Sequence, residues 1–371
     1  MAAFIQIRFN DRLFEHNIAG TIRILTTRVE RMPDLSTHPT HPRLADTGEP
    51  QPECLLLIIG ESLSRTHMSL YGYEYPTTPR LEARAAGGRL IPFTAASSPA
   101  TVTVPSFKQM MTRNSLANPD SVPWYDCTTI PELARAAGYT SDWISNQSHY
   151  GRHDSGVGIF ADICDHNKFI GNEYVGIYRY TYDGDLLAPL DSTIAAPSAK
   201  PRLIIVHLMG SHAAFHFRYP GAEAHFKGDD YPALPPESAV TMAHYDNSVL
   251  YNDKVVDAMF DKIEGLDAIA VYLSDHALDV FDADNTFSGN GRATIPASMA
   301  AAHRIPLMFY VTRRYAARRP ETVRRLRRGA ANPVNTDNLI YTIASLMGRR
   351  FADSAPDSPA AASERNTSGK N

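Results

Sequence analysis

The feature that most restricts the fold of this chain is a series of short, predominantly apolar segments with helical stretches between them. The apolar segments are 54–60, 140–145, 202–209, 267–274 and 305–312, and the helical stretches include 130–137 and roughly 238–263. Apolar strands that alternate with helices are typical of a mainly parallel sheet covered on both faces. The sequence therefore predicts one three-layer α/β/α domain from about residue 53 to residue 351.

The segments on either side of this domain have a different composition. Residues 1 to about 30 mix apolar and basic side chains, and residues 33–52 are rich in Pro, Thr and His, which is typical of a linker. Residues 352–371 are rich in Ser, Ala, Pro and Asp and are expected to be disordered. The chain thus divides into an N-terminal segment with a linker (1–52), a globular domain (53–351) and a tail (352–371).

Composition excludes several classes of protein. A hydrophobic fraction of 43% and a charged fraction of 20% are those of an ordinary globular protein. The net charge of -4 and the pI near 6.4 argue against a nucleic-acid binder. No segment approaches the roughly 18 consecutive apolar residues that a transmembrane helix needs. Charges near the N-terminus also do not fit a secretory signal, so the sequence predicts a soluble chain without a visible export signal.

The three cysteines follow no metal-binding spacing, which makes a metal-thiolate site improbable. Cys54 lies within an apolar strand and is expected to be a small buried hydrophobic residue. Cys127 and Cys164 are left as candidates for one disulfide.

Acidic residues and a histidine follow two of the apolar strands. Glu61 follows the first strand, and Asp275 and His276 follow 267–274. Ligand sites in open α/β sheets form at the carboxyl ends of strands, and two carboxylates with one imidazole suit a catalytic zinc ion. The alternative for Glu61 is a position in the first turn of a helix that begins at Ser62. For Asp275 and His276, the alternative is that they are polar residues that end a strand and have no role in metal binding.

A segment rich in hydroxyl groups, 95–107, contains candidates for a nucleophile. A hydroxyl becomes reactive when a metal or a base lowers its pKa. Composition does not distinguish Thr101 from Thr103, Ser97 or Ser98, and the alternative is an ordinary Ser/Thr/Pro loop.

Histidines cluster after the strand at 202–209. His207, His212 and His216 lie within ten residues, and a Gly turn separates the first two. The cluster favours a loop that bends over a site, and His212 is the best placed because it lies just beyond the turn. Single histidines more often have a structural role.

Several of these segments together resemble the phosphoethanolamine transferases of bacterial envelopes, a family of the alkaline phosphatase and sulfatase superfamily. The segments are 59–81, 143–147, 207–212, 245–248 and 273–276, and the first is highly specific. The resemblance is nearest to the branch that modifies the lipopolysaccharide core, and it extends from about residue 53 to 347.

This resemblance implies an activity and a set of site residues. Zn²⁺ would be bound by Glu61, Thr101, Asp275 and His276, with Thr101 as the nucleophile and Thr103 as the second choice. His212 would contact the substrate phosphoryl group or a second zinc ion, with His207 as a further substrate contact. The enzyme would take phosphoethanolamine from phosphatidylethanolamine and pass it to lipopolysaccharide, on lipid A or a core sugar.

The same resemblance implies a location at the periplasmic face of the bacterial inner membrane, with the membrane surface as a partner. Relatives have several transmembrane helices before the catalytic domain, whereas this sequence opens in what resembles their juxtamembrane linker. Two explanations remain open, a shortened reading frame and a detached catalytic domain.

This chain departs from the family after His276. Members continue with Gly-Glu and then another histidine, whereas this chain continues with Ala277-Leu-Asp279 and has no such histidine before His303. His303 is the candidate to replace it at the substrate, and Asp279 is a weaker candidate for the missing acid.

Three further alternatives follow from these patterns. A phosphodiester hydrolase of the same superfamily and a catalytically impaired binding domain remain open, whereas a sulfatase is disfavoured because no cysteine lies in a Cys/Ser-x-Pro-x-Arg signature.

The basic run 313–328, with eight arginines, suggests contact with anionic lipid. Such a run is more often a solvated helix face.

Overall fold

The computed structural model describes residues 35, 39–114, 116, 122–149, 155–171, 181–283, 287–288 and 296–353. Most of the predicted N-terminal segment and nearly all of the predicted disordered tail lie outside these residues. Within the described part of the chain, no helix has both the length and the apolar character needed to cross a bilayer.

Strands and helices alternate through the domain, as the sequence predicts. The strands are β1 (Leu44–Asp46), β2 (Cys54–Gly60), β3 (Leu90–Phe93), β4 (Ala96–Ser97), β5 (Thr140–Ser145), β6 (His166–Phe169), β7 (Arg202–His207), β8 (Ala268–Ser274), β9 (Asp279–Val280), β10 (Phe287–Ser288), β11 (Leu307–Val311), β12 (Val334–Asn335) and β13 (Arg349–Phe351). The α-helices are α2 (Pro79–Ala86), α3 (Thr103–Met110), α4 (Ile130–Ala136), α5 (Ser155–Asp162), α6 (Leu187–Ala195), α7 (Pro236–Ile263), α8 (Pro296–Ala302), α9 (Arg313–Arg318), α10 (Pro320–Gly329) and α11 (Leu339–Leu346).

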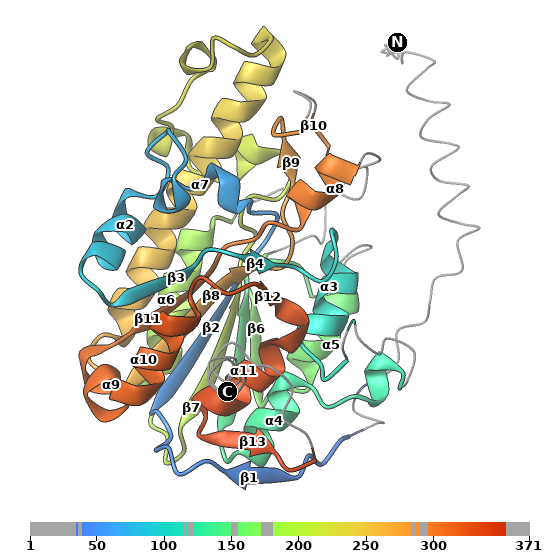
Figure 1. The fold of residues 1–371 in the computed structure, drawn as a ribbon, viewed down its shortest axis with the longest axis vertical. Coiled ribbons are helices and arrows are strands. Elements are labelled where there is room, and N and C mark those ends of the chain that lie inside the picture. The colour runs from blue at the N-terminus through green and yellow to red at the C-terminus, as the bar shows by residue number, and fades with distance from the viewer. Residues whose placement is uncertain are drawn as a thin grey trace, which may run out of the picture. The chain divides into compact units, whose positions relative to one another are not determined.

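The central sheet has seven strands in the order β3-β11-β8-β2-β7-β5-β6 (Figure 1). Strands β8, β2, β7, β5 and β6 are parallel to one another, and β11 is antiparallel to both β8 and β3. The prediction of a mainly parallel sheet is therefore confirmed, with an antiparallel edge that the apolar pattern did not reveal. Such an edge is common in large α/β sheets.

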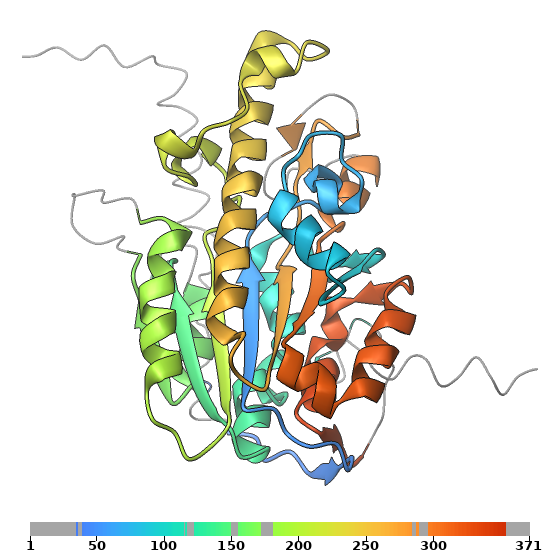
Figure 2. The same cartoon turned by 90° about the vertical axis from the view of Figure 1, so that its left-hand side faces the viewer.

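Both faces of the sheet are buried, which explains why its central strands are apolar throughout. Along β2, Leu55, Leu57 and Ile59 belong to one core, and the alternate residues Cys54, Leu56 and Ile58 belong to the other. The first core includes residues of α3, α4, α5 and α11, and the second includes residues of α2, α6 and α7. Figure 2 shows α7 crossing one face of the sheet, as expected for a three-layer α/β/α domain.

Part of the predicted linker belongs to the domain. β1, at Leu44–Asp46, pairs antiparallel with β13, the last strand of the domain in the sequence. Close by, the buried Arg319 donates from Nε to the Pro50 carbonyl at 2.7 Å and forms an ion pair with the buried Asp267. Arg319 therefore fixes the backbone that leads into β2, so this part of the predicted linker is held against the domain.

Two further predictions can be compared with the structure. All three cysteines are free, so the candidate disulfide between Cys127 and Cys164 does not form. The basic run forms α9 and α10, and seven of its eight arginines pair with carboxylates. The partners are Glu264 for Arg313, Glu53 for Arg314, Asp267 for Arg318 and Arg319, Glu321 for Arg324 and Arg328, and Glu49 for Arg325. These ion pairs are consistent with a solvated helix face, the alternative to a site for anionic lipid.

Candidate active site

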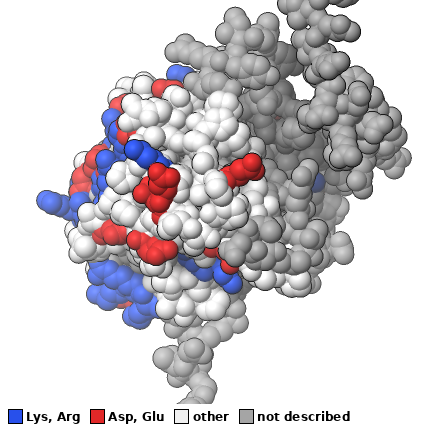
Figure 3. Space-filling view, turned by 90° about the horizontal axis from the view of Figure 1, so that it is seen from above, with Lys and Arg blue, Asp and Glu red and all other residues white. Residues whose placement is uncertain are grey.

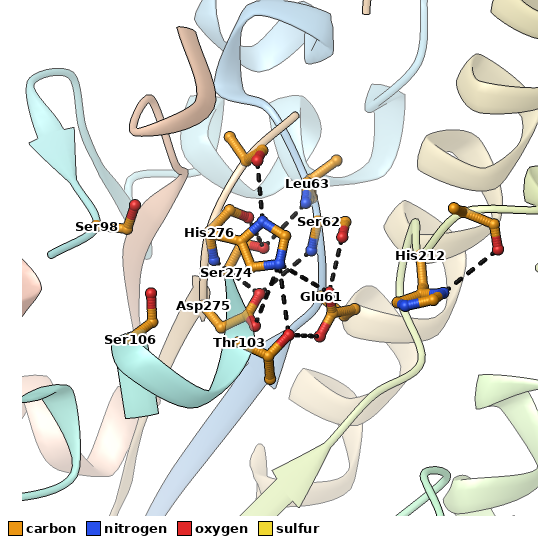
Figure 4. A network of polar contacts seen from close by, with 12 residues as sticks. Glu61, Ser62, Leu63, Ser98, Thr103, Ser106, His212, Ser274, Asp275 and His276 are labelled. Atoms are coloured by element: carbon orange, nitrogen blue, oxygen red, sulfur yellow. Dashed lines mark hydrogen bonds and ion pairs between the residues drawn. The ribbon is translucent and has the colours of Figure 1, made fainter. Parts of the chain in front are cut away.

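Three predicted ligands converge at the carboxyl ends of two neighbouring strands. Gly60 of β2 lies opposite Ser274 of β8 in the parallel ladder, so the residues that follow them meet at one point. One ligand atom each from Glu61, Asp275 and His276 lies within 4.8 Å of the other two. All three side chains are at most 1% exposed, and they face one another in Figure 4.

The turn after β2 aims Glu61 at this point. Ser62 has a φ of 59°, which is unusual for a residue with a side chain. Its N–H donates to Asp275 Oδ1 at 3.2 Å, and its hydroxyl donates to Glu61 Oε1 at 2.7 Å. No helix begins at Ser62, because the first helical turn starts at Arg65, so the alternative of a helix-cap role for Glu61 is wrong.

The chemistry of these three groups fits a zinc ion. His276 Nδ1 lies 2.9 Å from the Ala277 carbonyl, so this nitrogen donates and Nε2 is left to face the carboxylates. A metal-binding histidine is commonly oriented by such a bond. Asp275 Oδ2 is buried and has no hydrogen-bond partner in the described structure. A buried carboxylate oxygen without a partner is costly unless a cation offsets its charge.

The pKa shifts of the three groups show a shortage of positive charge. Burial, followed by the negative charge of Glu61, raises the pKa of Asp275 well above its ordinary value. Burial acts in the same direction on Glu61, but interactions with His276 outweigh it and lower the pKa of Glu61. Burial lowers the pKa of His276, yet Asp275 and Glu61 together raise it to about 10. Two carboxylates therefore compete for one imidazole, a conflict that a divalent cation would relieve.

Among the hydroxyl candidates of segment 95–107, Thr103 rather than Thr101 contacts these ligands. Thr103 Oγ1 donates to Glu61 Oε2 at 3.1 Å and lies 3.4 Å from His276 Nε2 (Figure 4). It is the first residue of α3, where the helix dipole favours negative charge. Within the described residues, Thr101 has no hydrogen bond to any of the three ligands. Thr101 precedes α3, the helix that orients the Thr103 hydroxyl. The structure therefore gives no support to the preference for Thr101 as a ligand.

The other hydroxyl candidates and His303 have structural partners. Ser97 Oγ donates to the Val334 carbonyl, and Ser98 Oγ donates to the Ala100 carbonyl at 2.7 Å. His303 Nδ1 lies 2.7 Å from the carbonyl oxygen of Ser98, to which it donates. His303 thus fixes the loop before Thr103. It has no hydrogen bond to the three ligands in the described structure, so nothing here supports the prediction that it replaces the missing family histidine.

The two histidines after β7 have different surroundings. His207 is 1% exposed, and its ring packs 5.0 Å from that of Phe107 and 5.8 Å from that of Trp143. Burial lowers its pKa to about 4, so the ring is neutral. The prediction that His207 contacts substrate gains no support from this buried position. His212 is only partly buried and lies beside Glu61 in Figure 4, and its charge helps to lower the pKa of Glu61.

Asp279 also has a structural role. Its Oδ1 accepts the backbone N–H groups of Asp282 and Ala283, and its Oδ2 accepts the Ser298 hydroxyl. Because these bonds use both oxygens to shape the loop after β9, Asp279 is a poor replacement for the missing acid.

A residue that the sequence did not single out supports the His212 loop. The buried Asp183 accepts the N–H groups of Met209 and Gly210, both at 2.8 Å, and the side-chain amide of Asn146. The next N–H, of Ser211, donates to the Glu61 carbonyl at 2.9 Å. Asp183 thereby holds the turn between the two histidines directly against Glu61.

Gly210 is expected to be essential to this contact. It has a φ of +53°, and a Cβ at this position would lie 2.7 Å from both the backbone N and the backbone O of Glu61. We expect Gly210→Ala to displace Glu61, to cost about 1–3 kcal/mol of stability and to weaken metal binding. Urea unfolding and zinc titration measure both effects. Gly72→Ala is the matched control, because Gly72 also has a positive φ, +97°, but no atom lies within 4 Å of its Cβ position. Equal losses in both variants would show that backbone strain alone is responsible.

The end of the domain viewed in Figure 3 has an uneven charge distribution. Seen from above, the described surface is mostly uncharged, with a few acidic side chains among the uncharged residues and basic side chains mainly toward its left edge. The three candidate ligands are two carboxylates and one imidazole. His276 is therefore the one group of the three that can carry positive charge.

Comparison with known proteins agrees with this geometry. The family model for Sulfatase matches residues 54–349, which span β2 to β13. The chain belongs to the sulfatase family. The periplasmic domain of EptC from Escherichia coli, solved as a complex with Zn, has a similar fold, with a TM-score of 0.77 and 27% identity over 86% of this chain and 88% of that domain.

Two curated relatives indicate the branch of the family. Phosphoethanolamine transferase EptC of Escherichia coli K12 is 32% identical over 64% of this chain and 41% of its own length. Kdo(2)-lipid A phosphoethanolamine 7''-transferase of Salmonella typhimurium is 27% identical over 71% of this chain and 45% of its own length. The resemblance to phosphoethanolamine transferases is therefore confirmed, and the chain spans less than half the length of these two relatives.

Proposed function

We propose that this domain transfers phosphoethanolamine from phosphatidylethanolamine to a lipopolysaccharide acceptor through a covalent intermediate on Thr103. The observation that supports this most strongly is the position of Thr103 Oγ1, 3.1 Å from Glu61 Oε2 and 3.4 Å from His276 Nε2. A hydroxyl beside a set of metal ligands, at the start of a helix, is suited to nucleophilic attack.

Glu61, Asp275 and His276 would hold the zinc ion. When bound, zinc lowers the pKa of a neighbouring hydroxyl and offsets negative charge on phosphoryl oxygens. Glu61 Oε2 accepts the hydrogen bond of Thr103 and so orients its hydroxyl. His212, partly exposed beside Glu61, would contact the phosphoryl group.

Two displacements complete the proposed reaction. Thr103 Oγ1 forms a bond to phosphorus and loses its proton, while the phosphorus–oxygen bond to diacylglycerol breaks and diacylglycerol takes up a proton. In the second step, an acceptor hydroxyl or phosphate oxygen forms a bond to the same phosphorus and gives up its proton, while the bond between phosphorus and Thr103 Oγ1 breaks and Oγ1 takes up a proton. Dividing the transfer in this way lets one site serve a lipid donor and a different acceptor. The acceptor is assigned to lipid A or a core sugar by analogy with the relatives.

Intact-mass spectrometry tests this function. Zinc-loaded protein incubated with phosphatidylethanolamine vesicles should gain one phosphoethanolamine group, and protein incubated with phosphatidylglycerol vesicles should gain none. Release of free phosphoethanolamine without added acceptor would instead favour the phosphodiester hydrolase. Zinc binding with neither adduct nor turnover would favour the impaired binding domain.

A further inference from the structure

The three proposed zinc ligands come from two separate loops. Glu61 begins the loop after β2, and Asp275 with His276 begins the loop after β8. The sheet aligns the two loops only as far as Gly60 and Ser274, where the ladder ends. Beyond that point, other contacts must fix the distance between them.

His67 connects these two loops. It lies on the loop after β2, its ring is 1% exposed, and its Nε2 is 3.4 Å from Asp282 Oδ2 on the loop after β8. The adjacent Thr66 donates its hydroxyl to the same oxygen at 3.0 Å. On the other side of the ring, His67 Nδ1 is 3.2 Å from Asp246 Oδ1 on α7. The imidazole therefore lies between two carboxylates.

The ring is positively charged in this environment. Burial by itself lowers the pKa of His67, but the hydrogen bond to Asp246 and the ion pair with Asp282 outweigh burial and raise it to about 9. The other groups that face this ion pair are Tyr73 and Tyr231, which donate to Asp246 Oδ2, and Arg304, whose charge acts on Asp282. These partners compensate the free-energy cost of removing the His67 and Asp246 charges from water.

The same contacts extend to the turn that aims Glu61. Asp246 follows Tyr245, whose ring lies 5.0 Å from that of His67. The Tyr245 hydroxyl donates to the Ser62 carbonyl at 3.1 Å and accepts the Ser64 N–H at 2.8 Å. On the other loop, Asp282 follows Phe281, whose φ of 66° is strained for a bulky residue. The ion pair thus joins two loops that each contain a strained residue.

We propose that His67 and Asp282 are positioning residues that clamp the two ligand loops together, so that breaking this ion pair weakens zinc binding although every ligand is still present. The inference rests on the zinc site of the proposed function, and it does not require phosphoethanolamine transfer.

Zinc titration of the wild type and its variants tests the clamp. We expect His67→Gln and Asp282→Asn each to raise the zinc Kd about 10- to 100-fold, the size typical of groups that orient metal ligands. The zinc Kd of the double variant should not exceed the higher of the two single-variant Kd values, because both substitutions remove the same ion pair. Asp282→Glu, which keeps the charge on a side chain that is 25% exposed, should retain most of the affinity.

A matched control and a pH series separate the clamp from a general loss of stability. His166→Gln removes a histidine that pairs with Asp142 at 3.0 Å, but its ring is 68% exposed and lies on an edge strand, so zinc affinity should not change. The ratio of the Kd of His67→Gln to that of the wild type should fall toward one as the pH rises through about 9, because the wild-type ring then loses its charge.

Several outcomes would overturn the clamp. These are an unchanged Kd in both single variants, additive losses in the double variant, equal losses in Asp282→Glu and Asp282→Asn, or a Kd ratio that does not vary with pH. If His67→Gln fails to fold, the two Asp282 variants decide the question. A wild type that binds zinc but transfers no phosphoethanolamine would refute the proposed function and leave the clamp intact, and a wild type that binds no zinc would refute both.

Discussion

Thr103→Ala is expected to abolish the covalent adduct and to reduce transfer by at least about 1000-fold, the scale expected when the nucleophile of a two-step enzyme is removed. The hydroxyl of Thr103 is the one that reaches Glu61 and His276, at 3.1 and 3.4 Å. Without it, the first displacement has no oxygen to attack phosphorus. Intact mass after incubation with phosphatidylethanolamine measures the adduct, and release of diacylglycerol measures turnover.

The matched controls lie within the same loop. Thr101→Ala removes a threonine hydroxyl two residues earlier and should leave adduct formation within a few-fold of the wild type. Thr103→Ser keeps an oxygen at the start of α3 and should retain measurable transfer. An adduct on Thr103→Ala, or its loss in Thr101→Ala, would return the nucleophile to Thr101.

The sequence predicted which three candidate ligands converge, but not which threonine lies beside them, and the reason is geometric. Glu61, Asp275 and His276 follow apolar strands directly, and the carboxyl ends of neighbouring parallel strands meet at one edge of a sheet. The choice between Thr101 and Thr103 depends instead on where α3 begins. Pro105, near the start of that helix, was the available signal, because proline is tolerated in the first turn of a helix.

Residues with distant partners were the hardest to interpret from sequence. His207 and His212 belong to one cluster in the sequence, yet the ring of one packs under α3 and the other lies beside Glu61. The partners of Asp183 and His67 come from other loops and helices, so nothing in their local sequence revealed them. β1 and β13 illustrate the same limit in the fold, since each is only three residues long and is defined by the other.

Glu61→Gln is expected to weaken zinc binding by at least about 100-fold, beyond the 10- to 100-fold typical of groups that merely orient a ligand. The substitution preserves the size of the side chain but removes one of the two carboxylate charges at the site. It also replaces one oxygen with an NH₂ group, which cannot bind a metal as a carboxylate oxygen does. Isothermal titration with zinc measures the affinity, and thermal unfolding shows whether the variant is folded.

Glu132 supplies the control that separates metal binding from helix capping. It is a buried glutamate, 6% exposed, whose carboxylate accepts the Thr129 N–H at 2.9 Å in a capping box at the start of α4. Loss of a cap typically costs about 0.5–2 kcal/mol, so Glu132→Gln should reduce the free energy of unfolding and leave zinc affinity unchanged. Glu61→Gln should instead lose zinc affinity, because its carboxylate is one of the three candidate ligands. A Glu61→Gln variant that loses stability but binds zinc like the wild type would refute the metal site.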